Sequence, residues 1–460
     1  MRHLCFRLMS AVGLIFLLMS TAFGQGPGDP LPTFPFSNFR FNFINPGGRA
    51  TAMGQAFIAL GDDATGSETN PAGLTALLTP QLFIEGRLVS NTFRTLAPTA
   101  EEIRYAETTD HQFSPTFLSL VYPFRNWAVG FYRQELADYA IDIHQRQATI
   151  PDVYNILYPT PTPVVVQQFD STIDFTLTNY GFSLAHRYGE RLNLGFSIRA
   201  SRLSFEALEV QPTEALGAFY RLPEGDTEAV QLRIRDDDWD ISWVAGLIVK
   251  PLDWLKIGAV YRSGSRHEVR AVFKENILDL QQQPLREEIP AFQIKIPDRY
   301  GVGVGLTPTD DLTLTFDVVR IEYGDLTPQF IGYIQQEFQD DYEFMHGWEI
   351  HLGGEYALYI RDVPVFLRVG FYSDPDNSLH FIGDRAGNDV FTLPPNVVIP
   401  INEVFNDFPR AQAALFPEND TDYHATFGLG MIFRNHFLLD LAADLSRETD
   451  YWAISFLYNF

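Results

Sequence analysis

An alternation of apolar and polar side chains runs through most of the chain from about residue 81 onward. Its clearest example is the C-terminal segment 451–460, in which every second residue from Trp452 to Phe460 is aromatic or aliphatic. The residues between them are small or mostly polar. Because successive side chains of a β-strand point to opposite faces, a period of two residues predicts strands with one apolar face. The same period argues against a helical repeat protein.

Fourteen segments show this period, and the links between them alternate in length. Short links such as Phe124-Arg125 and Gly189-Glu190 alternate with long links such as 138–170 and 374–421. This arrangement is typical of transmembrane β-barrels, which have short periplasmic turns and long extracellular loops. The segments lie near residues 81–93, 114–123, 126–137, 171–188, 191–206, 230–250, 254–273, 290–306, 311–323, 346–359, 364–373, 422–433, 436–446 and 451–460. We therefore expect an all-β fold, a 14-stranded antiparallel transmembrane β-barrel over residues 81–460 with both ends on the periplasmic side.

The composition agrees with a barrel and excludes other classes. Aromatic residues make up 14% of the chain, with 39 Phe and 20 Tyr, and a barrel places such residues at both membrane interfaces. Past residue 24 there is no apolar run long enough for a transmembrane helix. The net charge of −25 argues against a nucleic-acid partner, which requires basic patches. A soluble β-sandwich or propeller stays open, although its loops would not alternate in length.

The first 24 residues have the pattern of a secretory signal peptide. Arg2 and Arg7 form a basic start, and an apolar stretch follows from Leu8 to Phe23. We expect cleavage near Gly24, with an uncleaved anchor as the alternative. The single cysteine, Cys5, would leave with this segment, so no disulfide and no cysteine-based zinc site is expected in the mature chain.

Residues 25–80 do not alternate. Small residues recur between Ala50 and Ala64, and Asn70-Pro71 and a Gly/Asp cluster mark turns. Small side chains allow the backbone to pack closely in a confined space. We expect a compact, partly helical hatch that lies inside the barrel. The alternative is an extension packed under the barrel mouth.

Several of these motifs resemble a known family. The stretches Gly48-Arg49-Ala50, Met53-Gly54-Gln55-Ala56-Phe57, Asp62-Asp63 and Asn70-Pro71-Ala72-Gly73-Leu74 resemble the hatch of the FadL/TodX (OMPP1) outer-membrane transport family, and also the start of the related PorV/PorQ group. The later stretches 296–304 and 312–317 resemble its pattern of a proline, a glycine-rich strand and an aspartate strand. The residues carrying the hatch motif are Arg49, Gly54, Asp62, Asp63, Asn70, Pro71 and Gly73.

The resemblance implies a function. It suggests a bacterial outer-membrane channel that takes up hydrophobic compounds such as long-chain fatty acids or hydrocarbons, without a cofactor or metal. The alternatives are a PorV-like accessory of a protein-secretion or surface-attachment system, and an unspecific porin. Implied partners are the hydrophobic substrate, outer-membrane lipids and lipopolysaccharide, and the barrel assembly machinery. We expect the terminal strand, with Tyr458 and Phe460, to be the assembly signal. No Gly-x-Ser-x-Gly or His-Glu-x-x-His motif suggests an enzyme.

The alternation also predicts which ionisable side chains point into the lumen. They are Arg199, Asp317, Arg368, Asp440 and Asp444. Buried charges need partners, so we favour an internal salt-bridge network over a carboxylate-binding site for these residues. For Arg49, Asp62 and Asp63 we favour anchoring of the hatch to the wall over substrate contact. Gly301, Gly303 and Gly305 should make room for the hatch. The run Asp236–Asp240 is expected to be a hydrated strand end rather than a cation site.

Overall fold

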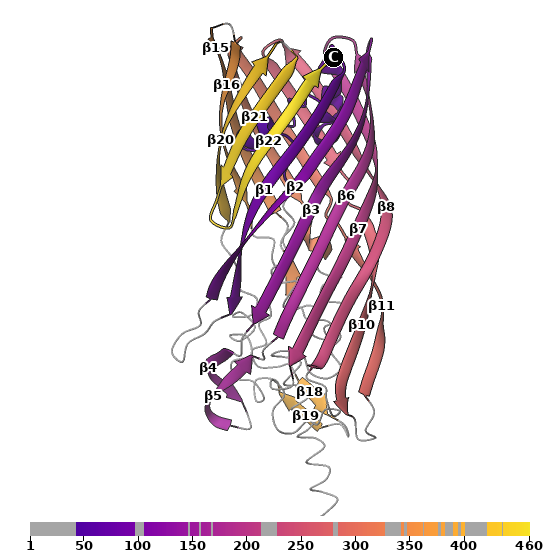
Figure 1. Ribbon diagram of the computed structural model, residues 1–460, viewed down its shortest axis with the longest axis vertical. Coiled ribbons are helices and arrows are strands. Elements are labelled where there is room, and N and C mark those ends of the chain that lie inside the picture. The colour runs from indigo at the N-terminus through magenta and orange to yellow at the C-terminus, as the bar shows by residue number, and fades with distance from the viewer. Residues whose placement is uncertain are drawn as a thin grey trace, which may run out of the picture.

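The computed structural model confirms the closed antiparallel barrel (Figure 1). The predicted signal peptide, residues 1–24, lies outside the described residues. Within the described ranges, no helix has both the length and the apolar character needed to span a membrane. The structure describes residues 43–96, 105–145, 148–155, 158–166, 169–212, 228–278, 284–326, 342–344, 347–361, 363–375, 379–381, 390–393, 397–400, 421–434 and 436–460.

The predicted number of strand positions around the barrel is confirmed; we call each position a stave, whether one strand or two strands in line fill it. The main sheet contains sixteen strands, but two of them continue others, so that fourteen staves form the wall. β1 pairs with β2 and with β22, and β8 pairs with β9, which closes the ring. In order around the barrel the staves are β1 (Gln81–Leu96), β2 (Tyr105–Phe124), β3 (Trp127–Gln145), β6 (Phe169–Tyr188), β7 (Leu192–Pro212), β8 (Glu228–Leu252), β9 (Leu255–Arg262) with β10 (Arg266–Leu278), β12 (Arg299–Thr309) with β11 (Pro284–Lys295), β13 (Leu312–Ile321), β15 (Gly347–Ile360), β16 (Val363–Asp374), β20 (Asp422–Phe433), β21 (Phe437–Leu445) and β22 (Thr449–Asn459).

Two neighbouring staves are interrupted, which the sequence pattern did not predict. The segments expected as single strands near 254–273 and 290–306 break at residues 263–265 and 296–298. The register is the same on both sides of the break, because Arg262 pairs with Arg299 and Arg266 pairs with Lys295. A Cβ atom at Gly264 would lie 1.6 Å from the carbonyl oxygen of Ile296, so only glycine permits this approach.

The wall is much taller on one side than on the other (Figure 1). β7 and β8 have 21 and 25 residues, whereas β13 and β21 have 10 and 9. The tall strands extend into links that the sequence pattern assigned to loops, such as 94–113 and 138–170. These links also hold short hairpins, which the pattern missed: β4 (Ala148–Asn155) with β5 (Tyr158–Val166), β18 (Val390–Leu393) with β19 (Val397–Pro400), and the paired strands β14 (Tyr342–Phe344) and β17 (Leu379–Phe381).

Residues 43–80, which precede β1, lie inside the barrel at the end with the short turns (Figure 1), whereas residues 25–42 of the expected hatch lie outside the described residues. It contains α3 (Gly48–Ala52), α4 (Gly66–Thr69) and the 3-10 helix η1 (Pro71–Ala76), and nearly all of it is buried. The backbone turns at Gly54 and Gly61, where φ is +60° and +51°. A Cβ atom at Gly54 would lie 2.5 Å from the carbonyl oxygen of Leu352, so a glycine is required there. We call residues 43–80 the hatch.

Candidate functional site

A row of aromatic rings divides the tall wall into two zones. The rings of Trp243 and Tyr261 lie 4.7 Å apart, those of Tyr261 and Tyr300 lie 4.9 Å apart, and Tyr180 stacks on Trp239 at 5.8 Å. We call the part between this row and the short turns the turn-side zone, and the part beyond it the loop-side zone. A second set of exposed aromatic residues lies near the short turns: Tyr122, Phe124, Trp127, Tyr188, Trp254, Tyr359 and Phe460. Two such girdles are expected at the two interfaces of a membrane.

In the turn-side zone the wall is apolar outside. Outward residues such as Phe182, Leu184, Leu194, Phe196 and Ile198 are exposed. The inward positions of the same strands hold small or polar residues, namely Gly181, Ser183, Ala185, Gly195 and Ser197. An apolar outer face with a polar inner face is what a membrane-spanning barrel requires.

In the loop-side zone the two faces exchange character. The inward side chains of Phe175, Leu177, Leu203, Phe205, Ile234 and Val269 are buried, and Phe175 and Phe205 meet edge-on at 5.5 Å. Most outward positions of these strands are polar or charged, with Leu208 as an exception, and Ser171 and Glu209 are buried polar residues on the inner face. The polar or charged outward residues are Thr172, Asp174, Arg202, Glu206, Arg233 and Arg235. This part of the lumen is therefore lined by apolar groups, and its outer surface suits water.

One group of hatch charges contacts the short side of the wall. Arg49 donates from Nε and Nη2 to the two carboxylate oxygens of Glu355, at 2.9 Å each, and from Nη1 to Asp62 at 2.8 Å. Arg368 donates to Glu355 and to Asp440, both at 2.6 Å. The five side chains form one chain of alternating charge, which is buried at Glu355, Arg368 and Asp440 and partly exposed at Arg49 and Asp62. Glu355 was missed by the sequence analysis, although it stands opposite Arg368 in the ladder.

Burial and these partners act against each other on the hatch groups. Burial alone would raise the pKa of Asp62, but Arg49 and Lys256 outweigh it and hold this pKa well below the ordinary value. Burial dominates at Asp63 and raises its pKa, since Arg49 offsets only part of the cost. The Nη1 atom of Arg49 is 3.8 Å from Asp63, compared with 2.8 Å from Asp62. The two adjacent aspartates therefore differ in their cost of ionisation.

A second group of charges lies under the tall wall. One oxygen of Glu68, in α4, is 3.7 Å from Arg199, 3.4 Å from Arg262 and 3.8 Å from Arg299. All four side chains are buried, and the ring of Phe43 lies 4.4 Å from the Arg299 guanidinium. Arg262 also donates to the carbonyl oxygen of Thr69. Glu68, Arg262 and Arg299 were missed, because neither glutamate in a non-alternating segment nor arginine at a strand end gives a periodic signal.

The remaining predicted lumen residues have different neighbours. Asp317 accepts a hydrogen bond from the backbone N–H of Ile58 at 2.8 Å. Asp444 is bound to the wall instead, accepting from Tyr372 at 2.8 Å and lying 2.7 Å from Nδ1 of His424. Among the glycines, a Cβ atom at Gly301 would lie 2.4 Å from Ile58, whereas Gly305 has only ordinary contact distances of 3.4 Å and more.

The other hatch-motif residues have backbone functions. Asn70, which precedes Pro71, donates to the carbonyl oxygen of Ile58 at 2.8 Å and accepts from the N–H of Ala72. A Cβ atom at Gly73 would lie 2.2 Å from the carbonyl oxygen of Gly61. At the far end of the chain, the rings of Tyr458 and Phe460 lie 4.8 Å apart.

The wall is not evenly paired between β2 and β3. Their ladder ends at the pair Phe117 and Gln134, although β1 and β6 accompany these strands much farther. Beyond that point β2 and β3 diverge (Figure 1). Side chains bridge the place where they part: Arg133 donates to the carbonyl oxygen of Pro115, and Ser114 donates to Glu135. Backbone pairing is thus replaced by a few side-chain bonds at the level of the aromatic row.

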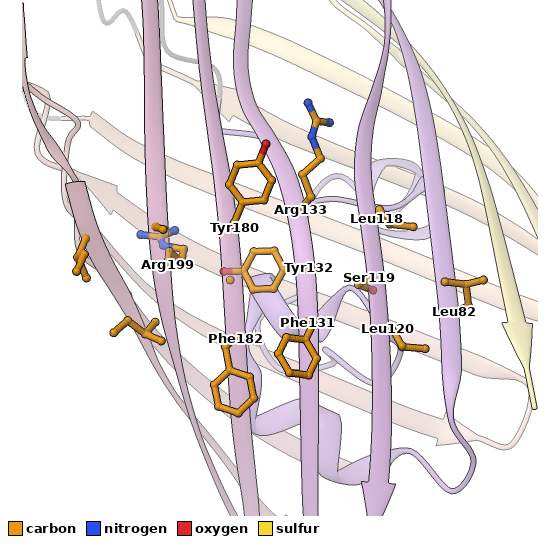
Figure 2. Close-up of a pocket in the computed structure, with 14 residues that line it drawn as sticks. Leu82, Leu118, Ser119, Leu120, Phe131, Tyr132, Arg133, Tyr180, Phe182 and Arg199 are labelled. Atoms are coloured by element: carbon orange, nitrogen blue, oxygen red, sulfur yellow. The ribbon is translucent and has the colours of Figure 1, made fainter. Parts of the chain in front are cut away.

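A shallow apolar groove lies beside this point (Figure 2). It has a volume of about 760 Å³ and crosses the staves from β1 to β8. Its exposed lining is mainly apolar and includes Leu118, Leu120, Phe131, Phe182 and Ile241. Arg133 and Tyr180 lie together at one end of the groove (Figure 2). The groove therefore adjoins the β2–β3 divergence on an outer surface that suits hydrocarbon.

Comparisons with known proteins agree with this architecture. A sequence model described as "Outer membrane protein transport protein (OMPP1/FadL/TodX)" matches residues 36–377. No curated protein matches the chain. Solved structures with a similar fold include the Pseudomonas putida toluene transporter TodX (14% identity, 91% of this chain and 99% of that chain, TM-score 0.58), the Ralstonia pickettii toluene transporter TbuX (14%, 92% and 100%, 0.55) and a Pseudomonas aeruginosa FadL homologue (13%, 91% and 99%, 0.59).

Proposed function

Because the chain belongs to the OMPP1/FadL/TodX family of outer membrane transport proteins, we propose that it is a channel for the uptake of hydrophobic compounds. Its barrel fold and its place in the outer membrane follow from the family. The class of compound is our proposal, and long-chain fatty acids and hydrocarbons such as toluene are the probes that test it. The comparisons offer no support for the alternative of a PorV-like secretion accessory.

The observation that supports this proposal most strongly is the apolar lining of the loop-side zone. A channel for polar solutes needs a hydrated lumen. Here Phe175, Leu203, Phe205 and Val269 face inward and are buried, so the interior at this level is apolar. A hydrophobic compound gains about 25 cal/mol for each Å² of apolar surface that it transfers from water into such an interior. No catalytic side-chain arrangement is assigned to the protein.

The hatch acts in this proposal as a plug. Arg49 anchors it to Glu355, Asp62 anchors it to Lys256, and Glu68 anchors it to the arginines of the tall wall, while Asp63 faces Arg49 within the hatch. These contacts favour anchoring over direct contact with the substrate. Arg199, Arg368 and Asp440 complete the two anchors. Asp317 holds the hatch separately, through the backbone N–H of Ile58, and Asp444 braces the wall.

The proposed route out of the lumen is lateral. The hatch fills the barrel on the turn side, whereas the β2–β3 ladder stops at Phe117 and Gln134. A compound that leaves between these strands arrives at the outer groove beside Leu118 and Phe131, and can pass into the membrane without crossing water. Lipids, lipopolysaccharide and the assembly machinery, through Tyr458 and Phe460, are the other partners that we propose.

Uptake measured in a deletion strain tests this function. Radiolabelled oleate and toluene should enter the strain slowly, and the wild-type gene should restore uptake, while glucose uptake stays constant. In a background without Cys5, Ser114→Cys with Glu135→Cys, joined by a short thiol cross-linker, should block restoration.

A matched pair tests whether cross-linking itself is harmful. Thr92 and Thr109 face each other across the intact β1–β2 ladder, so Thr92→Cys with Thr109→Cys should leave restoration unchanged after the same treatment. Normal entry of both probes in the deletion strain would refute the proposed function. Full uptake by the cross-linked Ser114/Glu135 variant would refute only the lateral route.

A further inference from the structure

The wall has a second interruption, on the side of the barrel away from β2 and β3. β8 pairs with β9 up to Val244 and Arg262, and it pairs with β10 only from Ile234 and Ala271 onward. Between these two ladders, β8 remains fully paired with β7 on its other edge. The interruption therefore affects only the edge of β8 that faces β9 and β10. We call this unpaired stretch the seam.

Three aspartate side chains occupy this seam. The carboxylate of Asp240 accepts a hydrogen bond from the backbone N–H of Arg266 at 2.6 Å, and Asp238 accepts from that of Glu268 at 2.9 Å. Asp236 accepts from the N–H of Arg270, also at 2.9 Å. Alternate residues of one strand thus replace the carbonyl oxygens that a neighbouring strand would normally supply. The expectation of a hydrated strand end at these aspartates was wrong, since they lie within β8 and bind β10.

The pair β10–β11 has few other attachments. Both strands break from their staves at the same level, at 263–265 and 296–298. In the described sheet, β11 pairs only with β10, because β12 and not β11 pairs with β13. Five backbone pairs join β10 to the end of β8, between residues 271–275 of β10 and residues 230–234 of β8. β10–β11 (Figure 1, lower right) thus extends beyond the two breaks as a pair of strands, held to the rest of the described wall by β8 and by the ion pair of Lys295 with Asp325.

The seam separates two apolar surfaces. Val269 and Ala271 face inward and are buried with Ile234 in the apolar lining of the loop-side zone. On the outside, Trp239 and Ile241 of β8 are 54% and 67% exposed, next to the aromatic row. A hydrophobic compound at the outer interface of the membrane therefore lies one strand width from the apolar lumen.

We propose that β10–β11 is a flap hinged at the two breaks and that Asp236, Asp238 and Asp240 form its latch. Its opening, which rests on the uptake function proposed above, is a second, lateral portal through which hydrophobic compounds enter the loop-side lumen. The latch suits repeated opening. A side-chain carboxylate at a partly exposed seam can turn away from the backbone N–H that it binds and accept from water instead. A backbone carbonyl in a paired strand moves only together with its strand. The side chain of Asp238 is 35% exposed, so water reaches it.

The hinge also touches the hatch anchor. Arg199 donates to the carbonyl oxygen of Ser263, within the break, at 2.6 Å, and it lies 3.7 Å from Glu68 of the hatch. Arg262, the residue that ends β9, binds the carbonyl oxygen of Thr69. Movement of the flap would therefore first disturb the hydrogen bonds that these two arginines make.

Thiol labelling of the full-length protein in outer-membrane vesicles tests the flap without any transport assay. In a background without Cys5, Val269→Cys places a thiol on the buried inner face of β10. Asp236→Ala, Asp238→Ala and Asp240→Ala together should raise its rate of reaction with a bulky maleimide about tenfold, because local opening limits such reactions. A thiol at Ala185→Cys, equally buried in β6 at the level of the hatch, should keep its rate.

Two controls keep the result interpretable. Heat-dependent migration on gels identifies folded barrel, and the Asp→Asn triple variant, which keeps an acceptor oxygen at each position, should label near the wild-type rate. A disulfide between Arg233→Cys and Val272→Cys, which are paired across β8 and β10, should return the Asp→Ala variant to slow labelling. The matched disulfide between Glu206→Cys and Arg235→Cys, across β7 and β8, should not. An unchanged Val269→Cys rate in folded Asp→Ala protein would overturn the latch, and so would equal rates with the two disulfides.

Discussion

The turn-side and loop-side zones are continuous along the same strands, yet they use the same alternation in opposite ways. On β7, Phe196 faces outward and Ser197 inward in the turn-side zone. Nine residues after Phe196 the strand still alternates, but Phe205 faces inward and Glu206 outward. The period of two residues reports only that a strand has two unlike faces. Which face is apolar reports the solvent on each side, and it changes where the membrane ends.

The largest effect should come from the inner face of the loop-side zone. Phe205→Ala removes a fully buried ring that packs against Phe175, and we expect it to cost about 3–5 kcal/mol in the free energy of unfolding. Ser197→Ala, on the same face of the same strand, removes the hydrogen bonds of its hydroxyl with Ser183 and Tyr132, and it should cost about 1 kcal/mol. Urea titrations in lipid vesicles measure both. Equal losses would show that the two zones have similar interiors.

The outer face gives the next largest difference. Phe196→Arg places a charge on the lipid-facing surface and should destabilise the barrel by about 2–4 kcal/mol. Ser204→Arg, also outward on β7 but beyond the aromatic row, should change stability by about 0.5 kcal/mol or less. The same titrations apply. A comparable loss at Ser204 would place the membrane boundary farther along the strand than the aromatic row indicates.

The smallest effect concerns the hatch, where Asp62 and Asp63 can be compared. The pKa of Asp62 is lowered in the folded protein, so its anchoring is present at neutral pH and is lost as the pH falls through that depressed value. The pKa of Asp63 is raised, so its ionisation opposes the closed hatch, and this cost disappears as the pH falls toward the ordinary carboxyl range. Asp62→Asn should weaken the anchor by about 1.5–3 kcal/mol, and Asp63→Asn should not weaken it.

Ion conductance in planar bilayers measures this difference. Asp62→Asn should show more frequent open events than the wild type at neutral pH, whereas Asp63→Asn should stay as closed as the wild type. A leak of equal size in both variants would mean that the hatch does not distinguish the two carboxylates.

Much of the barrel could be predicted from the sequence because it depends on local pattern. The fourteen staves follow from alternation and link length, and the hatch follows from the loss of alternation around Gly54 and Asn70. The breaks at 263–265 and 296–298 could not be predicted, since the side chains keep their period through them. Nor could the partners of Glu68, because a contact between the hatch and strand ends such as Arg262 depends on the register of distant staves.

The bond between Arg49 and Glu355 joins residues that are 306 positions apart in the chain. Contacts of such sequence separation form late, because the intervening chain must first lose its freedom. Arg49 is made long before Glu355 during synthesis, and the pairing of β15 with β16 places Arg368 beside Glu355, the residue that accepts from Arg49. We therefore expect folding to run against the order of the sequence, with the barrel formed first and the segment that precedes it set in place last.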